Sequence, residues 1–167
     1  MTTTRKSNIM IKLYTIGFTG KSAETFFNLL KNNAVEGIVD TRINNTSQLA
    51  GYAKAQDLAF FAKQIGNMDY THRVDFAPTK DLLADYRNKK ITWDNYETEY
   101  LNLLDRRKIA TKFPVQHLHQ HCLLCSEHTP EKCHRRLLAE YTCSAPFSFS
   151  LKPSKITFRY GSDSSGA

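Results

Sequence analysis

The stretch YTIGFTGKSAETFF, residues 14–27, contains the change from strand to helix that decides the fold. Its first part continues the apolar run of residues 11–17, which is typical of a buried strand. Ser22 can then cap a helix in which Phe26 and Phe27 lie on one apolar face. The stretch therefore predicts a strand, a short turn and a helix that packs back on that strand.

The turn contains Gly-Lys-Ser, the end of the P-loop motif G-x-x-x-x-G-K-[ST], in which backbone N–H groups surround a phosphate. Counted back from Gly20, the first glycine of a P-loop should stand where this chain has Thr15. This spacing argues against a P-loop. Gly17, Lys21 and Ser22 remain candidates for ligand binding because they follow a strand. The alternative is that they form only a glycine turn and a serine cap.

Outward from this stretch, strand patterns and helix patterns alternate along the chain. Strand patterns cover residues 11–17, 35–40, 68–74, 121–126 and 155–160. Helix patterns begin near Ser22, Leu58, Thr79 and Trp93 and at Thr129-Pro130, and Gly66 can end the second. This alternation predicts an α/β fold with one mainly parallel sheet of about four to five strands and helices on both faces. We expect a flexible N-terminus over residues 1–10, a single domain over residues 11–160 and a flexible tail over residues 161–167.

The composition is that of an ordinary soluble surface with a moderate excess of positive charge. The 167 residues carry a formal charge of +7, from 23 Lys and Arg against 16 Asp and Glu, which favours anionic partners. No apolar run approaches the length of about 18 residues that a membrane span needs, and the start lacks a signal-peptide pattern. We therefore expect a cytoplasmic protein without a membrane partner, whose four cysteines are thiols.

Polar loops follow the predicted strands at residues 17–22, 40–51 and 125–135. In an open parallel sheet the ligand crevice lies beyond the carboxyl ends of the strands, so these loops should meet there. The second loop offers four ligand-binding candidates: Asp40, Arg42, Asn44 and Ser47. The alternative is a structural Asp40–Arg42 pair with turn-forming Asn and Ser residues.

The segment CLLCSEHTPEKCHRRLLAEY, residues 122–141, carries most of the groups that can do chemistry. Five candidates lie where a strand passes through a loop into a helix: Cys125, Glu127, Cys133, His134 and Arg135. A helix N-terminus and guanidinium groups attract anions and lower thiol pKa values. With a helix that begins at Thr129-Pro130, Cys133 is about one turn inside it, where a buried structural thiol fits as well as a reactive one.

A zinc site is a competing interpretation, since Cys122-x-x-Cys125 and Cys133-His134 contain suitable ligands. Cys122 and Cys125 are three apart on a strand, however, so their side chains should point to opposite faces. His117, His119 and His121 should share one face of an extended chain, but the outer two are about 13 Å apart, too far for one ion. We therefore expect no metal site, and no cofactor that folding requires.

A non-catalytic nucleic-acid-binding module is the other alternative. It would use four scattered basic residues, Arg106, Arg107, Lys108 and Lys112, together with the basic tail, so any such binding should be mostly electrostatic. The apolar stripe of the preceding helix consists of Trp93, Tyr96, Tyr100, Leu103 and Leu104. Its helical spacing indicates core packing rather than an aromatic ligand box.

Four blocks, YTIGFTGKSAETFFNLL, IVDTRINNTSQLAGYAK, APTKDLL and CLLCSEHTPEKCHRRLLAEY, together resemble the bacterial and archaeal family catalogued as domain of unknown function 488. The resemblance covers residues 12–141. The family's recurring motifs correspond here to Thr15-Ile16-Gly17, Asp40-x-Arg42, Ser47, Leu124-Cys125-x-Glu127 and Cys133-His134-Arg135. Cys122 and the extra histidines are outside this pattern, which further weakens zinc, and after residue 141 the sequence departs from it. The resemblance implies a family and no particular activity.

These observations favour an enzyme or sensor whose polar crevice binds an anionic, nucleotide-like ligand. In this interpretation Arg42 and Arg135 hold the anion together, Glu127 or His134 moves a proton, and Cys133 is the reactive thiol in preference to Cys125. The oligomeric state does not follow from the sequence.

Overall fold

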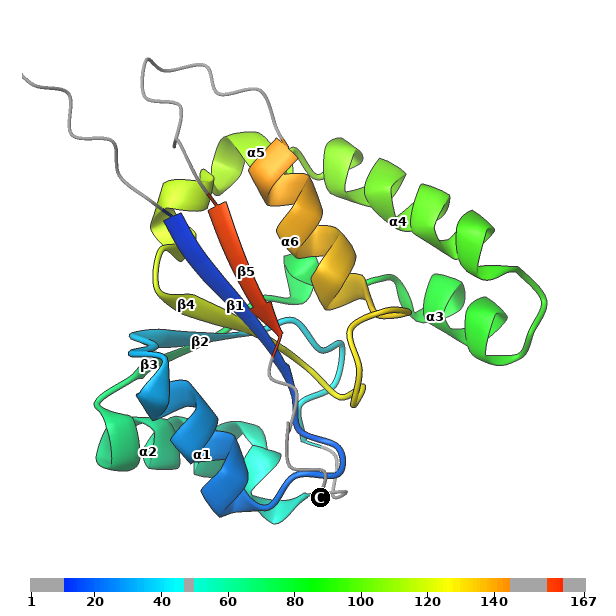
Figure 1. Ribbon diagram of the computed structural model, residues 1–167. Helices are drawn as coiled ribbons and strands as arrows, with labels where there is room; N and C mark the ends of the chain where they lie inside the picture. Colours follow the sequence, from blue (N-terminus) through cyan, green and yellow to red (C-terminus); the bar gives the residue numbers. More distant parts are fainter. Residues whose placement is uncertain (1–10, 47–49, 145–155, 161–167) are drawn as a thin grey trace, which may run out of the picture.

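A computed structural model describes residues 11–46 and 50–144 and the backbone of residues 156–160 (Figure 1). The ends that we expected to be flexible, residues 1–10 and 161–167, lie outside these ranges, and so does Ser47. The described residues form one α/β unit around a single sheet, as predicted.

The sheet contains five strands, all parallel, in the order β3-β2-β4-β1-β5. They are β1 (Ile11–Gly17), β2 (Gly37–Asp40), β3 (Asp69–His72), β4 (His121–Cys125) and β5 (Ile156–Tyr160). The three inner strands, β2, β4 and β1, are almost continuously buried, as strands covered on both faces are. The register pairs Gly17 with Cys125 and Asp40 with Leu124, so β1, β2 and β4 end at the same edge.

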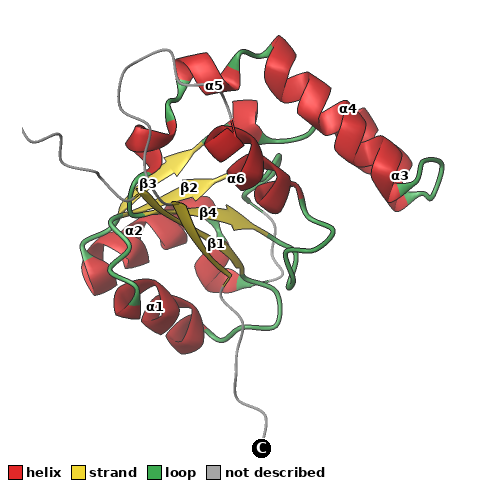
Figure 2. Cartoon of the chain, turned by 45° about the horizontal axis from the view of Figure 1, so that its top comes forward, coloured by secondary structure: helices red, strands yellow, loops and turns green. Residues whose placement is uncertain are grey.

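Helices cover both faces of the sheet (Figures 1 and 2). α1 (Ala23–Asn32) and α2 (Ala55–Gly66) lie on one face, and α4 (Trp93–Arg106), α5 (Ile109–Lys112) and α6 (His134–Ser144) lie on the other. Tyr14 and Ile16 pack into the core of the first face and Leu13 into that of the second, the alternation that a strand imposes. None of the helices that the structure describes combines the length and the apolar character needed to cross a membrane.

A helical hairpin reaches past the sheet on the second face (Figure 2). It consists of α3 (Lys80–Arg87), which buries none of its residues, and α4, which buries Tyr96, Tyr100, Leu103 and Leu104. Short 3-10 helices occupy Gly51–Ala53, Val74–Phe76 and Val115–Leu118. The hairpin therefore contributes fully buried residues to the core only through α4, while Leu82, Leu83 and Tyr86 of α3 pack against that core from its margin.

The helix starts follow the predicted capping chemistry. The Ser22 hydroxyl accepts a hydrogen bond from the Thr25 amide (3.1 Å), and the Thr79 hydroxyl accepts one from the Leu82 amide (3.2 Å). At the end of α2, however, the left-handed residue is Asn67, with φ of 50°, and Gly66 is still helical. Asparagine tolerates this conformation better than most residues, so it can replace the expected glycine.

The last described helix was predicted wrongly at its start, because α6 begins at His134 and not at Pro130. Residues 126–133 form a loop, in which the Cys133 amide donates to the carbonyl of Pro130. Cys133 therefore immediately precedes the helix instead of lying one turn inside it. Residues 115–118 are also helical rather than extended, so the row of histidines expected on one strand face does not form.

Candidate functional site

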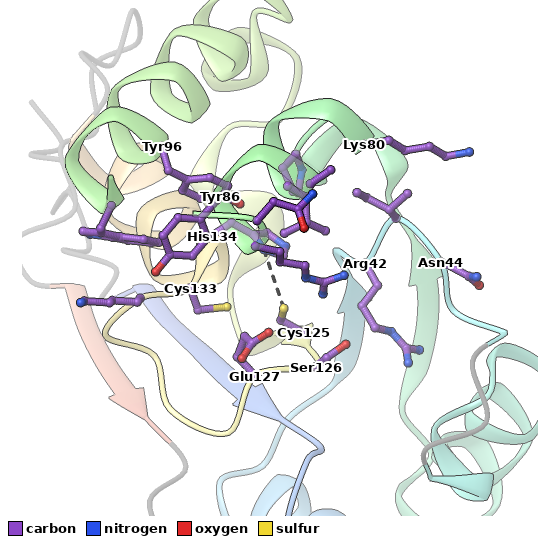
Figure 3. A pocket seen from close by; sticks show the side chains of 18 of the residues that line it. Arg42, Asn44, Lys80, Tyr86, Tyr96, Cys125, Ser126, Glu127, Cys133 and His134 are labelled. Atoms are coloured by element: carbon purple, nitrogen blue, oxygen red, sulfur yellow. Dashed lines mark hydrogen bonds between the residues drawn. The ribbon is translucent and has the colours of Figure 1, made fainter. Parts of the chain in front are cut away.

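A cavity of about 930 Å³ opens at the carboxyl edge of the sheet (Figure 3). One side is formed by the loops after β1, β2 and β4, which supply Thr19, Arg42 and residues 125–127. The other side is the α3–α4 hairpin. This is the position where open parallel sheets bind ligands, and the volume suits a small molecule.

Two thiols and one imidazole lie together at the inner end of this cavity, and we call them the sulfur–histidine cluster. Cys125 ends β4, Cys133 precedes α6 and His134 begins α6; all three are buried and line the cavity. One ligand atom from each lies within 4.8 Å of the other two, and Cys125 Sγ is 3.7 Å from His134 Nδ1. The late start of α6 creates this cluster, because it brings Cys133 and His134 to the end of β4.

Thr41 fixes the orientation of the His134 ring. The Thr41 hydroxyl donates its proton to the carbonyl of Leu124 (2.8 Å), so its oxygen can only accept from His134 Nε2 at 3.0 Å. The Thr41 carbonyl is a second acceptor, also 3.0 Å from Nε2. Nε2 therefore carries a proton, and Nδ1 faces the Cys125 sulfur.

The cluster separates the two thiols electrostatically. A hydrogen bond from the Cys133 thiol, helped by the nearby His134 ring, holds the pKa of Cys125 well below its usual value although burial opposes this. Donating that hydrogen bond, together with burial, raises the pKa of Cys133. Burial alone would lower the pKa of His134, but the Cys125 sulfur outweighs it and the net shift is upward. The contact of Cys125 Sγ with His134 Nδ1 thus favours thiolate character at Cys125.

Asp40 and Arg42 form a buried ion pair beside the cavity. Arg42 donates to both carboxylate oxygens, from Nε at 2.8 Å and from Nη2 at 2.6 Å, and Nη2 also donates to the carbonyl of Ala53 at 2.8 Å. The Tyr70 hydroxyl donates to the same carboxylate at 2.7 Å. Figure 3 shows the guanidinium of Arg42 directed away from the cysteines. Its hydrogen-bonding capacity is thus largely used within the protein, as the structural alternative anticipated.

Arg135 lies beneath the loop after β4 and does not line the cavity. It is 2% exposed, and its Nη1 donates to the carbonyl of Glu127 (2.7 Å) and approaches Cys133 Sγ at 3.3 Å. Gly17 allows this arrangement, because a Cβ there would lie 1.6 Å from the carbonyl oxygen of Glu127 and 3.2 Å from Arg135 Nη1. Arg42 and Arg135, which we expected to hold one anion together, thus belong to two separate hydrogen-bond networks inside the protein.

The hairpin supplies cations and aromatic rings that the sequence analysis did not select. Besides the buried Arg42, three cations line the cavity, and we call them the cationic rim: Lys80 and Arg87 of the hairpin and Lys132 of the loop before α6. All three are exposed, and among the residues described none of them forms an ion pair. Arg87 lines the cavity together with Tyr96, whereas Figure 3 shows Lys80 directed outward at the mouth.

An aromatic wall formed by Tyr86, Trp93 and Tyr96 accompanies the rim. The rings of Trp93 and Tyr96 are stacked at 5.2 Å, and Tyr86 contacts both. Tyr100 continues the row to the edge of the His134 ring, at 5.7 Å. The predicted core role of the α4 stripe is confirmed for its buried residues, but Trp93 and Tyr96 also face the cavity.

The other predicted site residues are divided between the cavity and the framework. Glu127 and Asn44 are exposed and line the cavity. Lys21 and Ser22 do not line it: Lys21 is buried, with its carbonyl accepting from Tyr52, and Ser22 caps α1. Among the basic residues of the nucleic-acid alternative, Arg107 donates to the carbonyls of residues 75 and 77.

Apart from Lys132, which lies in the loop after β4, the residues of the rim and the wall were missed because they do not follow a strand. Lys80, Arg87 and Trp93 belong to two successive helices, and only the packing of α4 on α6 brings them over the sheet edge. One signal was present in the sequence: α3 has too few apolar residues to be covered, yet it carries Tyr86 and Arg87 side by side. An exposed aromatic and cationic helix next to a predicted crevice is a candidate binding surface.

Comparison with known proteins assigns the chain to a family on the basis of the segment that contains this site. The model of the family described as domain of unknown function DUF488 matches residues 22–142, which include the β2 loop, the hairpin and the sulfur–histidine cluster. No curated protein and no solved structure shows significant similarity to the chain. The family match extends over most of the chain, and the protein therefore belongs to the DUF488 family.

Proposed function

We propose that this protein is an enzyme or sensor that binds an anionic, nucleotide-like ligand in the cavity, with the sulfur–histidine cluster as its reactive group. One observation carries the proposal: a single cavity combines exposed cations, a wall of aromatic rings and a buried thiol–imidazole cluster. Phosphate groups bind guanidinium and ammonium groups, and planar bases stack on aromatic rings.

The arrangement supports a definite orientation of the ligand. Arg87 and Lys132 are exposed and unpaired among the described residues, so binding a phosphate there displaces no internal partner. The half-buried Trp93 offers a ring surface beside them. A base against the aromatic wall and phosphates at the rim would leave the middle of the ligand above Cys125.

The chemistry that follows from this placement is thiol or general acid–base chemistry. Cys125, with His134 at 3.7 Å, is the group we assign to the reacting atoms in place of Cys133. Glu127 lies exposed at the cavity wall, where its carboxylate can exchange protons between the ligand and solvent.

Trp93 provides a direct test, because it is the only tryptophan in the chain and it lines the cavity. We expect its fluorescence to change on titration with at least one of the common ribonucleoside mono- and diphosphates, and the change should saturate. Inorganic pyrophosphate should compete with that nucleotide. Failure of the entire nucleotide panel to bind at millimolar concentration, checked by calorimetry, would contradict the proposal.

Matched variants locate the binding. Arg87→Ala should weaken the nucleotide about tenfold to a hundredfold, the value of one guanidinium–phosphate contact. Arg106→Ala removes another exposed arginine of the same hairpin that does not line the cavity, and it should leave binding unchanged. Equal losses in both variants would indicate general charge attraction instead of a site.

A further inference from the structure

Cys125, Cys133 and His134 have the arrangement of a three-ligand metal site. The two sulfurs and the imidazole nitrogen lie within 4.8 Å of one another, and the separation of Cys125 Sγ and His134 Nδ1 is 3.7 Å. Tetrahedral zinc, with Zn–S of about 2.3 Å and Zn–N of about 2.0 Å, places its ligand atoms about 3.5–3.8 Å apart. Only a small closure of the cluster is needed to reach that geometry.

The second ring nitrogen of His134 is held as in a metal-binding histidine. Nε2 carries its proton, because both groups that it meets, the Thr41 carbonyl and the Thr41 hydroxyl oxygen, can only accept. Metal-bound histidines typically donate this second N–H to a carbonyl or a similar acceptor, which fixes the ring. Nδ1, which faces Cys125, is then the nitrogen available to a metal.

The charges around the cluster also suit a divalent ion. Two thiolates neutralise a 2+ charge, so the site buries no uncompensated charge of the ion. Arg135 Nη1 lies 3.3 Å from Cys133 Sγ, where it can donate to the thiolate as a second-layer partner. Cys122 takes no part, because it lies in the core on the opposite face of the sheet.

We infer that Cys125, Cys133 and His134 bind one Zn²⁺ or another thiophilic divalent ion, with the fourth coordination position open to the cavity. All three residues line the cavity, so that position faces the space in which the ligand is proposed to bind. With the ion bound, Cys125 and His134 are metal ligands, and the open position of the ion takes the place that the proposed function gives to the Cys125 thiolate. Three protein ligands and one open position are typical of catalytic rather than structural zinc. The inference reverses the expectation of no metal site, which had rejected zinc because of the strand geometry of Cys122.

Cobalt titration of the reduced, chelator-treated full-length protein under anaerobic conditions tests this inference. Co²⁺ should bind with a stoichiometry of one, produce a thiolate-to-cobalt charge-transfer band and the intense visible bands of a four-coordinate ion, and be displaced by Zn²⁺. Azide should shift the visible bands if the fourth position is open. An absence of the charge-transfer band at several equivalents of Co²⁺ would overturn the site, and bands insensitive to azide would overturn its open position.

Variants identify the ligands. Cys125→Ser, Cys133→Ser and His134→Asn should each weaken cobalt binding at least tenfold, whereas Cys143→Ser and Cys122→Ala should retain the wild-type spectrum. Loss of the band in Cys122→Ala with retention of the fold would overturn the assignment. If a ligand variant does not fold, zinc-edge X-ray absorption of the zinc-loaded wild-type protein identifies the ligands instead. We expect two sulfurs and one imidazole, and any other set of protein ligands contradicts the site. Neither measurement requires a nucleotide, so its outcome is independent of the proposed ligand.

Discussion

The two buried arginines and the cationic rim carry the same charge within one region of the molecule but have different roles. Arg42 and Arg135 are 4% and 2% exposed and are hydrogen-bonded to a carboxylate, to carbonyls and to a sulfur. Arg87 is exposed, lines the cavity and has no ion pair among the residues described. A motif position after a strand therefore does not by itself make an arginine a ligand-binding residue.

The difference follows from how each arginine balances its charge. A buried guanidinium needs internal acceptors, because an unpaired charge in the interior is very costly. When these acceptors are groups of the protein itself, the guanidinium can bind an external anion only if its internal hydrogen bonds are broken. An exposed guanidinium keeps its hydration and exchanges it for a phosphate at little cost. The buried arginines thus shape the cavity, and the rim is available to the ligand.

The largest effect should come from removing the charge that balances Arg42. Asp40→Asn keeps the volume of the side chain but leaves a buried cation without its carboxylate, so we expect a loss of about 3–5 kcal/mol in the free energy of unfolding. Urea denaturation measures this loss. The double variant Asp40→Asn/Arg42→Gln should be more stable than Asp40→Asn alone, and a single variant within about 1 kcal/mol of wild type would refute the structural role.

Arg135→Ala should have the next largest effect on stability. It removes the donor to the Glu127 carbonyl and leaves a cavity where a side chain was 2% exposed, for which we expect a loss of about 2–4 kcal/mol. Its neighbour Arg136 is partly exposed and pairs with Glu140 and Glu97, so Arg136→Ala is the matched control, with a loss of at most about 1 kcal/mol. Similar losses in the two variants would remove the distinction between buried and exposed arginines.

The rim should behave in the opposite way. Arg87→Ala should change the free energy of unfolding by less than about 0.5 kcal/mol, as is usual for an exposed side chain without partners. The same change should weaken the nucleotide by about 1.5–3 kcal/mol, measured by calorimetry with the nucleotide selected through Trp93 fluorescence. A destabilised variant with unchanged nucleotide affinity would place Arg87 among the structural arginines.

We expect the smallest effect on stability from the half-exposed ion pair of Arg73 and Asp75. Arg73 donates to both oxygens of Asp75 through Nε and Nη2, and this lowers the pKa of Asp75, with burial opposing the shift. The pKa of Asp75 is lower in the folded protein than in the unfolded chain. The pair therefore stabilises the fold at pH values above about 4, the ordinary pKa of a carboxylate. This stabilisation is lost as the pH falls through the folded-state pKa. Asp75→Asn should flatten the acid limb of the stability profile by at most about 1 kcal/mol, since solvent screens the pair.

An unchanged acid limb in Asp75→Asn would indicate that the pair contributes nothing measurable. A loss of stability in Asp75→Asn as large as that in Asp40→Asn would show that burial makes no difference between the Arg73–Asp75 pair and the Arg42–Asp40 pair.

The sequence predicted the sheet well because its strands are short apolar runs that end at recognisable loops. Ile11 to Gly17 and Gly37 to Asp40 form the predicted strands, and Ser22 and Thr79 form the predicted caps. These features depend on local chemistry, in which neighbouring residues decide the outcome. The parallel topology then brought the β2 and β4 loops to one edge, as expected.

The details of the site could not be predicted in the same way. The loop before α6 is held by hydrogen bonds from Arg135 to the carbonyl of Glu127 and from the Cys133 amide to that of Pro130, and the packing of α4 on α6 positions Arg87. A three-residue cluster of Cys125, Cys133 and His134 appears only when α6 begins after Cys133. Tertiary contacts thus decided both the metal-like cluster and the identity of the exposed cations.

A crystal structure of the protein with the nucleotide that Trp93 fluorescence selects would show directly whether the rim or the buried arginines bind the phosphate. We expect phosphate oxygens within hydrogen-bonding distance of Arg87 or Lys132, the base against Trp93, and the Asp40–Arg42 pair unchanged. A phosphate bound by Arg42 and Arg135 after their internal partners have been displaced, or bound outside the cavity, would contradict this expectation.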